Sequence, residues 1–134
     1  MKTELTEEMR DRLVSSVCKI YGDNLLSIIL YGSVARNSAT DDSDIDIAFI
    51  VTRDEAEMHD KLLDVIVDLN LEYDQLISPS MIEIDIYNKW RKVLPYYKNI
   101  ENEGVVLWKG VNFTINRLLF SVFTMLSRLF ETDA

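Results

Sequence analysis

The apolar positions along the chain follow two periods, one typical of helices and the other of buried strands. In residues 6–21 they recur every three or four residues, which predicts an amphipathic helix with Thr6 as its N-cap and Gly22 as its end. Residues 24–32 are rich in branched apolar residues and close at Gly32, which indicates a buried strand. The chain therefore begins as a helix followed by a strand.

The same alternation continues after Gly32. Ten small or polar residues, with room for one short helical turn, separate Ser33 from a second strand over residues 44–51. Asp54 is the expected cap of a helix that reaches about residue 70. The apolar positions expected to share one face of that helix are Met58, Leu62, Leu63, Ile66 and Leu69.

The middle of the chain has shorter patterns. Residues 71–78 predict a third strand, which Pro79 would end. Residues 81–87 either extend the sheet or begin another helix, and the pattern is too short to decide. Helical turns are expected on both sides of Pro95, the second of them ending at Gly104.

The C-terminal part combines a short strand with a long amphipathic helix. Residues 105–109 predict an edge strand, and the apolar stripe of residues 111–130 predicts a helix. The fold class is therefore α/β (α+β), a small mixed sheet flanked by helices over residues 1–110. Residues 111–134 add a C-terminal helix, which packs either on the domain or on a partner, and homo-oligomers through this helix are one form of the second alternative.

Composition narrows the function classes. The 134 residues suit a single core, and the formal net charge of −9 argues against a nucleic-acid partner. The one cysteine, Cys18, excludes an internal disulfide, and the N-terminus has no secretion signal, so a cytoplasmic location is expected. Asn and Arg residues interrupt the C-terminal apolar stretch, which argues against a membrane span.

Two acids open the second predicted strand. Asp44 and Asp46 are two residues apart, so an extended backbone points both carboxylates to one face. Such a pair is unfavourable unless a cation or hydrogen bonds compensate, and Mg²⁺ prefers oxygen ligands together with substrate phosphates. Gly32 lets the backbone approach a phosphate closely, while Ser33 and Arg36 add a hydroxyl donor and a positive charge. The pattern predicts a magnesium and phosphate site.

This stretch resembles the minimal nucleotidyltransferases, small members of the nucleotidyltransferase superfamily that includes DNA polymerase beta. The segment GSVARNSATDDSDIDI carries the resemblance, which extends less specifically over residues 25–108. One departure is Asn37, which stands where the family usually has glycine, and asparagine tolerates the left-handed backbone better than most residues. The matching positions are Gly32, Ser33, Ala35, Arg36, Ser43, Asp44, Ile45 and Asp46.

The resemblance implies a third carboxylate on the strand beside Asp46, which completes a two-metal site for in-line nucleotidyl transfer. Asp74, expected early in the third strand, is the first choice, and Asp85 is the rival. The catalytic and metal-binding set is then Asp44, Asp46 and Asp74, with Gly32, Ser33 and Arg36 at the nucleotide.

The resemblance also implies a function and a partner. It indicates an Mg²⁺-dependent enzyme that transfers AMP from ATP to a hydroxyl group on a protein, as antitoxins do to helical toxins of the HEPN type. The alternative is an antitoxin or adaptor that neutralises its partner by contact, with little or no catalysis. Modification of a small molecule is disfavoured, because such enzymes generally carry a further substrate-binding region.

Overall fold

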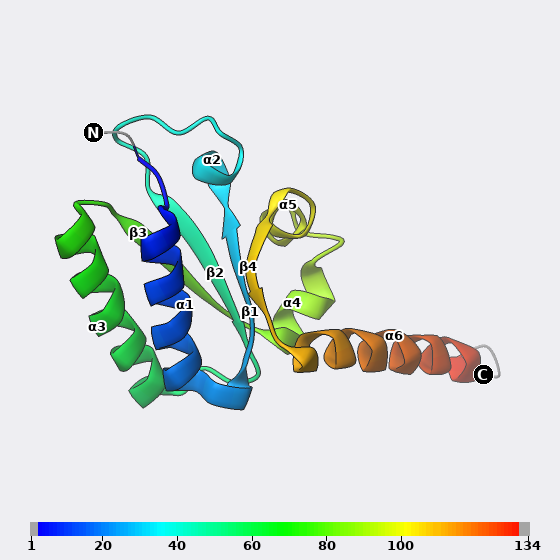
Figure 1. The fold of residues 1–134 in the computed structure, drawn as a ribbon. Helices are drawn as coiled ribbons and strands as arrows, with labels where there is room; N and C mark the ends of the chain where they lie inside the picture. Colours follow the sequence, from blue (N-terminus) through cyan, green and yellow to red (C-terminus); the bar gives the residue numbers. More distant parts are fainter. Residues whose placement is uncertain (1–2, 132–134) are drawn as a thin grey trace.

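The computed structural model describes residues 3–131, which form a four-stranded mixed sheet with helices on both faces (Figure 1). The strands lie in the order β3-β2-β1-β4, with β1 antiparallel to β2 and β4, and β2 parallel to β3. The strands are β1 (Leu25–Tyr31), β2 (Ile45–Val51), β3 (Ile77–Glu83) and β4 (Val105–Lys109). The α/β class and the mixed sheet expected from the sequence are thus confirmed.

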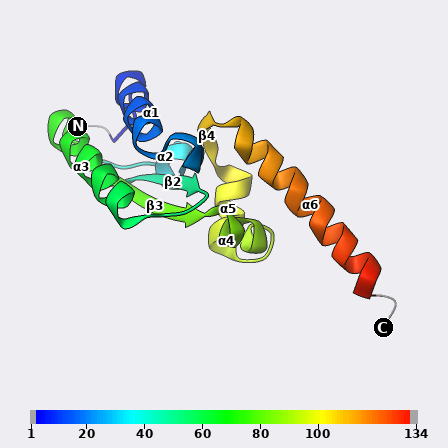
Figure 2. The ribbon, with the colours of Figure 1, turned by 90° about the horizontal axis from the view of Figure 1, so that it is seen from below.

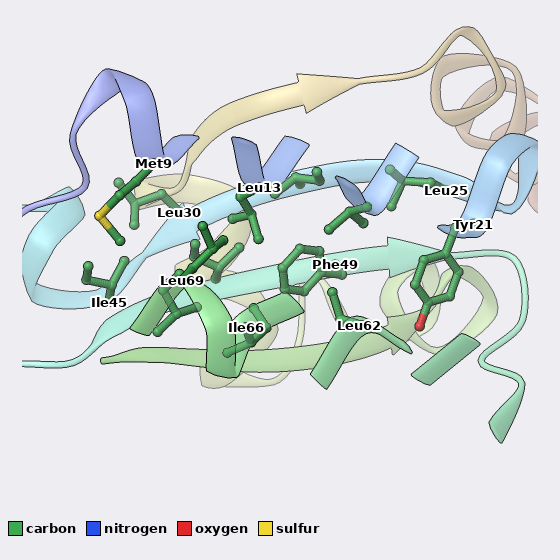
Figure 3. Close-up of a cluster of buried hydrophobic side chains, with 14 of the residues drawn as sticks. Met9, Leu13, Tyr21, Leu25, Leu30, Ile45, Phe49, Leu62, Ile66 and Leu69 are labelled. Carbon is green, nitrogen blue, oxygen red and sulfur yellow. The ribbon is translucent and has the colours of Figure 1, made fainter. Parts of the chain in front are cut away.

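Two long helices cover one face of the sheet. These are α1 (Glu7–Tyr21) and α3 (Ala56–Tyr73), which pack side by side (Figure 1). Leu13, Phe49 and Leu62 are fully buried between these helices and the sheet (Figure 3). Burying a side chain of this size stabilises a fold by about 1.5–3 kcal/mol, so this cluster is the main core.

The helices on the other face are shorter. They are α4 (Ile84–Trp90) and α5 (Pro95–Glu103), with a second core formed by Ile50, Tyr87 and Ile100. A one-turn helix, α2 (Gly32–Ala35), follows β1, and a short 3₁₀ turn, η1 (Gly22–Asn24), joins α1 to β1. Helix α2 lies where β1 ends and β2 begins, which is the same end of the two central strands because they are antiparallel.

The first predicted helix ends as the sequence indicates. The Thr6 side chain accepts a hydrogen bond from the Met9 backbone N–H at 3.2 Å, and Gly22 follows the helix with a φ of 55°. The predicted N-cap and end are confirmed.

The start of α3 differs from the prediction. Glu55, not Asp54, is the N-cap residue, and it makes no capping bond through its side chain. Asp54 instead lies 3.0 Å from the Nδ1 atom of His59. Leu63, expected on the apolar face, is 38% exposed, because only Leu62, Ile66 and Leu69 of that set turn fully toward the sheet.

The third strand lies later in the chain than predicted. Residues 71–73 are the last turn of α3, and Asp74 ends this helix in the left-handed conformation with a φ of 52°. Strand β3 begins at Ile77 and runs through Pro79, which is tolerated because β3 is an edge strand and needs fewer backbone donors. Residues 81–87 divide between the two alternatives, since β3 ends at Glu83 and α4 begins at Ile84.

The C-terminal helix, α6 (Val111–Glu131), extends away from the rest of the molecule (Figures 1 and 2). Phe113 is its one buried residue within the described part of the chain. The helix therefore does not pack along its own domain. Across residues 3–131, no helix is both long enough and apolar enough to cross a bilayer.

Candidate functional site

Gly32 brings the Gly-Ser turn into contact with Asp46. Its φ is 77°, a region that side-chain-bearing residues rarely adopt, and it directly follows β1. A Cβ atom built on Gly32 would lie 2.2 Å from the Asp46 Oδ2 atom. Only glycine therefore allows this turn to lie against the carboxylate.

The turn itself is closed by backbone hydrogen bonds. The Ser38 N–H donates to the Ser33 carbonyl at 2.9 Å, and the Arg36 N–H donates to the Gly32 carbonyl at 3.1 Å. Asn37 has a φ of 57°, so it adopts the left-handed conformation that a glycine would tolerate at this position. The prediction that asparagine supports this turn is confirmed.

The two predicted metal-binding acids lie close together at the start of β2. Asp46 is within the strand and half-buried, whereas Asp44 is exposed and comes just before the strand. Burial, and then the negative charge of Asp44, raise the pKa of Asp46, while Arg36 lowers it. The two charged carboxylates thus repel each other, and a bound cation would reduce this repulsion.

These residues fit one divalent cation bound together with phosphate oxygens. Mg²⁺ is typically held by one or two carboxylates plus substrate phosphates and water. The described residues contain no group of three or more His, Cys, Asp or Glu side chains that could hold a metal ion. The donor set of Asp44 and Asp46 therefore suits a cation that arrives with a nucleotide, and it does not form a three-carboxylate centre.

Arg36 is close enough to Asp46 to lower the pKa of that carboxylate. Its Nη1 atom is 3.4 Å from the Glu103 Oε2 atom, and both side chains are about half exposed. An exposed ion pair of this kind is worth at most about 1 kcal/mol, so Arg36 is free to exchange Glu103 for a phosphate.

The two candidates for the third carboxylate are not beside Asp46. Asp74 is at the C-terminal end of α3, not on a strand, although it lines a hollow of about 290 Å³ with Asp44. Asp85 is in the first turn of α4, beyond the far end of β3. The expectation that Asp74 lies early in the neighbouring strand is wrong, because α3 continues three residues past Asn70 and delays the start of that strand.

Ser78 takes the place beside Asp46. The register pairs Asp46 with Ser78 on β3 and with Tyr31 on β1, and paired residues share one face of a sheet. A serine hydroxyl thus stands where the resemblance implies an acid. In the sequence, Ser78 and Ser80 alternate with apolar residues, which indicates a strand with both serines on one face. The prediction that Pro79 ends the strand hides this pattern.

A cluster of three hydroxyl groups extends from this position. The Tyr31 hydroxyl lies 3.0 Å from the Ser80 hydroxyl and 3.1 Å from the Tyr96 hydroxyl, and the Tyr96 hydroxyl donates to Ser80 at 2.9 Å. Tyr96 is on α5, so the cluster ties this helix to the sheet next to Asp46. Burial is the largest of the effects that raise the pKa of Tyr31, so this phenol stays protonated.

Curated relatives of the chain come from Methanocaldococcus jannaschii. One, named "Putative protein adenylyltransferase MJ0604", is 30% identical over 105 residues, which cover 76% of this chain and 97% of that protein. Another, named "Putative protein adenylyltransferase MJ1305", is 30% identical over 86 residues, and the match spans 62% of this chain and only 58% of that relative.

A solved structure shares the fold, and a family model matches most of the chain. One chain of a mutant MntA-HpeT toxin-antitoxin crystal structure superimposes with a TM-score of 0.51 at 13% identity, covering 92% of this chain and 95% of that one. The family model described as "Polymerase beta, Nucleotidyltransferase" matches residues 14–110, which include the Gly-Ser turn, Asp44 and Asp46. The chain therefore belongs to the polymerase beta nucleotidyltransferase family.

Proposed function

We propose that this protein transfers AMP from ATP to a hydroxyl group of a protein partner. The contact between Gly32 and the Asp46 carboxylate carries the proposal, since it brings a phosphate-binding turn and a cation-binding acid to one point. The two relatives named as protein adenylyltransferases support the adenylyl group and the protein acceptor.

In this proposal the chain's residues act mainly by position and charge. The turn at Gly32 and Ser33 receives the phosphates, and Arg36 turns from Glu103 toward them. Asp44 and Asp46 would hold Mg²⁺, which would neutralise phosphate charge and polarise the α-phosphorus. The acceptor hydroxyl oxygen forms the new bond to this phosphorus and its proton passes to water, while the bond to the bridging oxygen breaks and pyrophosphate leaves.

In this proposal the acceptor enters on the side of Asp46 and Ser78. Both residues lie on the sheet face that carries Tyr31, and α5 borders this face through Tyr96. The resemblance gives a HEPN-type toxin as the acceptor, with the hydroxyl on a tyrosine. Such a partner brings its own substrate surface, which this small domain would otherwise have to provide.

The test is incubation with labelled ATP, Mg²⁺ and the product of the neighbouring gene. We expect label on that partner with the wild type and none with the Asp44→Asn, Asp46→Asn double variant. The matched control is Asp41→Asn, Asp42→Asn, which makes the same change in charge at two exposed acids next to the site. Loss of transfer in both variants, or label that persists without Asp44 and Asp46, would contradict the proposal.

A second candidate function is neutralisation by contact. This candidate is favoured because the site offers fewer metal ligands than the resemblance implies. Ser78 lies beside Asp46, and residues 3–131 contain no three-carboxylate group that could hold a metal ion. Neutralisation by contact predicts a complex with the partner that forms equally well with the wild type and with the Asp44→Asn, Asp46→Asn variant, and no transfer of label by either.

A further inference from the structure

Helix α6 presents its apolar side to solvent. Arg117 bonds to Glu101 of α5 and Phe113 is buried, so this side of the first turns contacts the domain. The apolar residues beyond it are largely exposed, with Phe123 at 71% and Phe130 at 76%. Eleven large apolar residues of α6 are exposed: Val111, Ile115, Leu118, Leu119, Phe120, Val122, Phe123, Met125, Leu126, Leu129 and Phe130.

The composition of α6 is poor for a helix that stands alone. Over 21 residues it has no alanine or lysine, and most positions are β-branched, aromatic, or Asn and Ser, which have weaker helix propensity. Most helical stability in proteins comes from packing of an apolar face, and α6 has one buried residue. The helix therefore needs a cover outside its own domain.

The spacing along α6 is that of a coiled-coil seam. The residues at alternating steps of four and three are Val111, Ile115, Leu118, Val122, Met125 and Leu129, which makes three heptads without a break. Two of the three a positions, Ile115 and Val122, are β-branched, and two d positions are Leu118 and Met125. β-Branched residues at a with leucine-like residues at d favour two helices over three or four.

The exposed area is sufficient for a stable pair. The six seam residues and the flanking Leu119 and Leu126 are 46% to 78% exposed, so a pair that covers them buries on the order of 800 Å² from each copy. A standard interface uses about 800 Å² from each partner. The charges also permit self-pairing, because α6 carries only Arg117, Arg128 and Glu131, so most of the net charge of −9 lies on the domain.

We propose that two copies of this chain pair through α6, with the heptad stripe from Val111 to Leu129 as the seam. This pairing is independent of the transfer reaction, because the seam shares no residue with the Gly32 and Asp46 site. A helical partner protein is the other occupant that such a stripe could take, and the experiment separates the two.

The test is the mass of the purified full chain in solution, measured by light scattering and sedimentation equilibrium without any partner. We expect twice the chain mass of 15.5 kDa for the wild type at micromolar concentration. Leu118→Glu with Met125→Glu places two charges in the seam and should yield monomers, with at least a 100-fold weaker dimerisation constant. Both side chains are more than 60% exposed, so the domain should still fold.

The matched control is Thr124→Glu with Ser127→Glu, which adds the same charge outside the heptad stripe and should stay dimeric. Hydrogen exchange gives a second readout, since α6 amides should lose protection in the seam variant but not in the control. A monomeric wild type overturns the proposal. If, in addition, the wild type binds a helical partner and the seam variant does not, the partner is the occupant of the stripe. A seam variant that remains dimeric also overturns the proposal.

Discussion

Gly32 is the residue at which the two halves of the site meet. Its backbone lies against the Asp46 carboxylate with a positive φ, so both the conformation and the contact require a residue without a Cβ. Gly22 is a natural comparison, because it has a similar φ of 55° but nothing lies within 4 Å of an added Cβ. The two glycines therefore differ in whether an added Cβ would meet a neighbouring group.

Replacing Gly32 by alanine should therefore do more damage than replacing Gly22. Alanine is strained at either position, because side-chain-bearing residues rarely adopt a positive φ. Only Gly32→Ala also displaces the Asp46 carboxylate, so it alone should weaken Mg²⁺-dependent ATP binding, by tenfold or more. Urea denaturation measures the stability and calorimetry the affinity; equal ATP affinity in the two variants would count against the placement of the phosphates at Gly32.

Asp74 and Asp85 differ in their distance from the carboxylate pair. Asp74 shares a hollow with Asp44, whereas Asp85 follows β3, whose five steps from Ser78 to Glu83 span about 17 Å. We expect Asp46→Asn to abolish Mn²⁺ binding measured by electron paramagnetic resonance. Asp74→Asn should weaken it only about threefold, through the loss of a nearby charge, and Asp85→Asn not at all. An Asp74→Asn effect as large as that of Asp46→Asn would make Asp74 a metal ligand.

Strand β3 determines which group lies beside Asp46, the proposed cation-binding acid. Its register places Ser78 next to Asp46 and Ser80 in the hydroxyl cluster with Tyr31 and Tyr96. The edge position of the strand allows Pro79 between them. Because β3 supplies a serine and not an acid beside Asp46, the site lacks a third carboxylate on this strand.

Ser78→Asp should convert the pair into such an arrangement. Without a divalent cation, the added charge beside Asp46 should lower the free energy of unfolding by up to about 1 kcal/mol, because like charges side by side in a sheet repel. Mg²⁺ should restore this loss and raise the melting temperature above that of the wild type. Ser78→Asn, similar in size but uncharged, is the control and should show neither effect; the same Mg²⁺ response in both variants would rule out a position beside the cation.

Glu101 of α5 joins this helix to α4 and α6. It accepts hydrogen bonds from Tyr87 of α4 and from Arg117 of α6, and its Oε1 atom lies 3.3 Å from the Arg91 Nη1 atom. The Arg91 side chain is only 12% exposed. The base of α6 is thus held by charge as well as by Phe113.

Glu101→Gln should lower the free energy of unfolding by about 2 kcal/mol, because it removes a charged acceptor shared by two arginines. It should also speed hydrogen exchange in the first turn of α6. Glu103→Gln breaks only the half-exposed pair with Arg36 and should cost less than 1 kcal/mol. Equal costs measured by urea denaturation would argue against Glu101 as the anchor of α6.

The whole molecule has one covered and one partly open side. Helices α1 and α3 seal one sheet face around Leu13 and Phe49, while the site and the base of α6 lie with the shorter helices α4 and α5 (Figure 1). The stable core is therefore separate from the proposed nucleotide site and from the proposed seam on α6.

A pair formed through α6 should make the melting temperature depend on protein concentration. Association of folded chains adds stability by mass action, so a hundredfold increase in concentration should raise the melting temperature by several degrees. The Leu118→Glu, Met125→Glu variant should melt at the same temperature throughout. Differential scanning calorimetry over that range checks both expectations, and a constant wild-type melting temperature would contradict the pairing.

The first half of the chain could be read from its sequence because its signals are local. Neighbouring residues determine the cap at Thr6, the helix end at Gly22 and the patterns of β1 and β2. The motif of the site also lies within one short segment, with Gly32, Ser33, Arg36, Asp44 and Asp46. Periodicity and turn chemistry act over a few residues, which is the range that a sequence displays.

The start of β3, the residue beside Asp46 and the orientation of α6 were decided by tertiary structure. Helix α3 continues to Tyr73 although Asn70 and the following residues are compatible with a strand, and Pro79 is acceptable only because β3 is at the edge. Strand register joins Asp46 to a serine 32 positions later, through pairing between distant segments. The stripe on α6 is visible in the sequence, but whether a stripe is buried depends on which surfaces the folded chain leaves beside it.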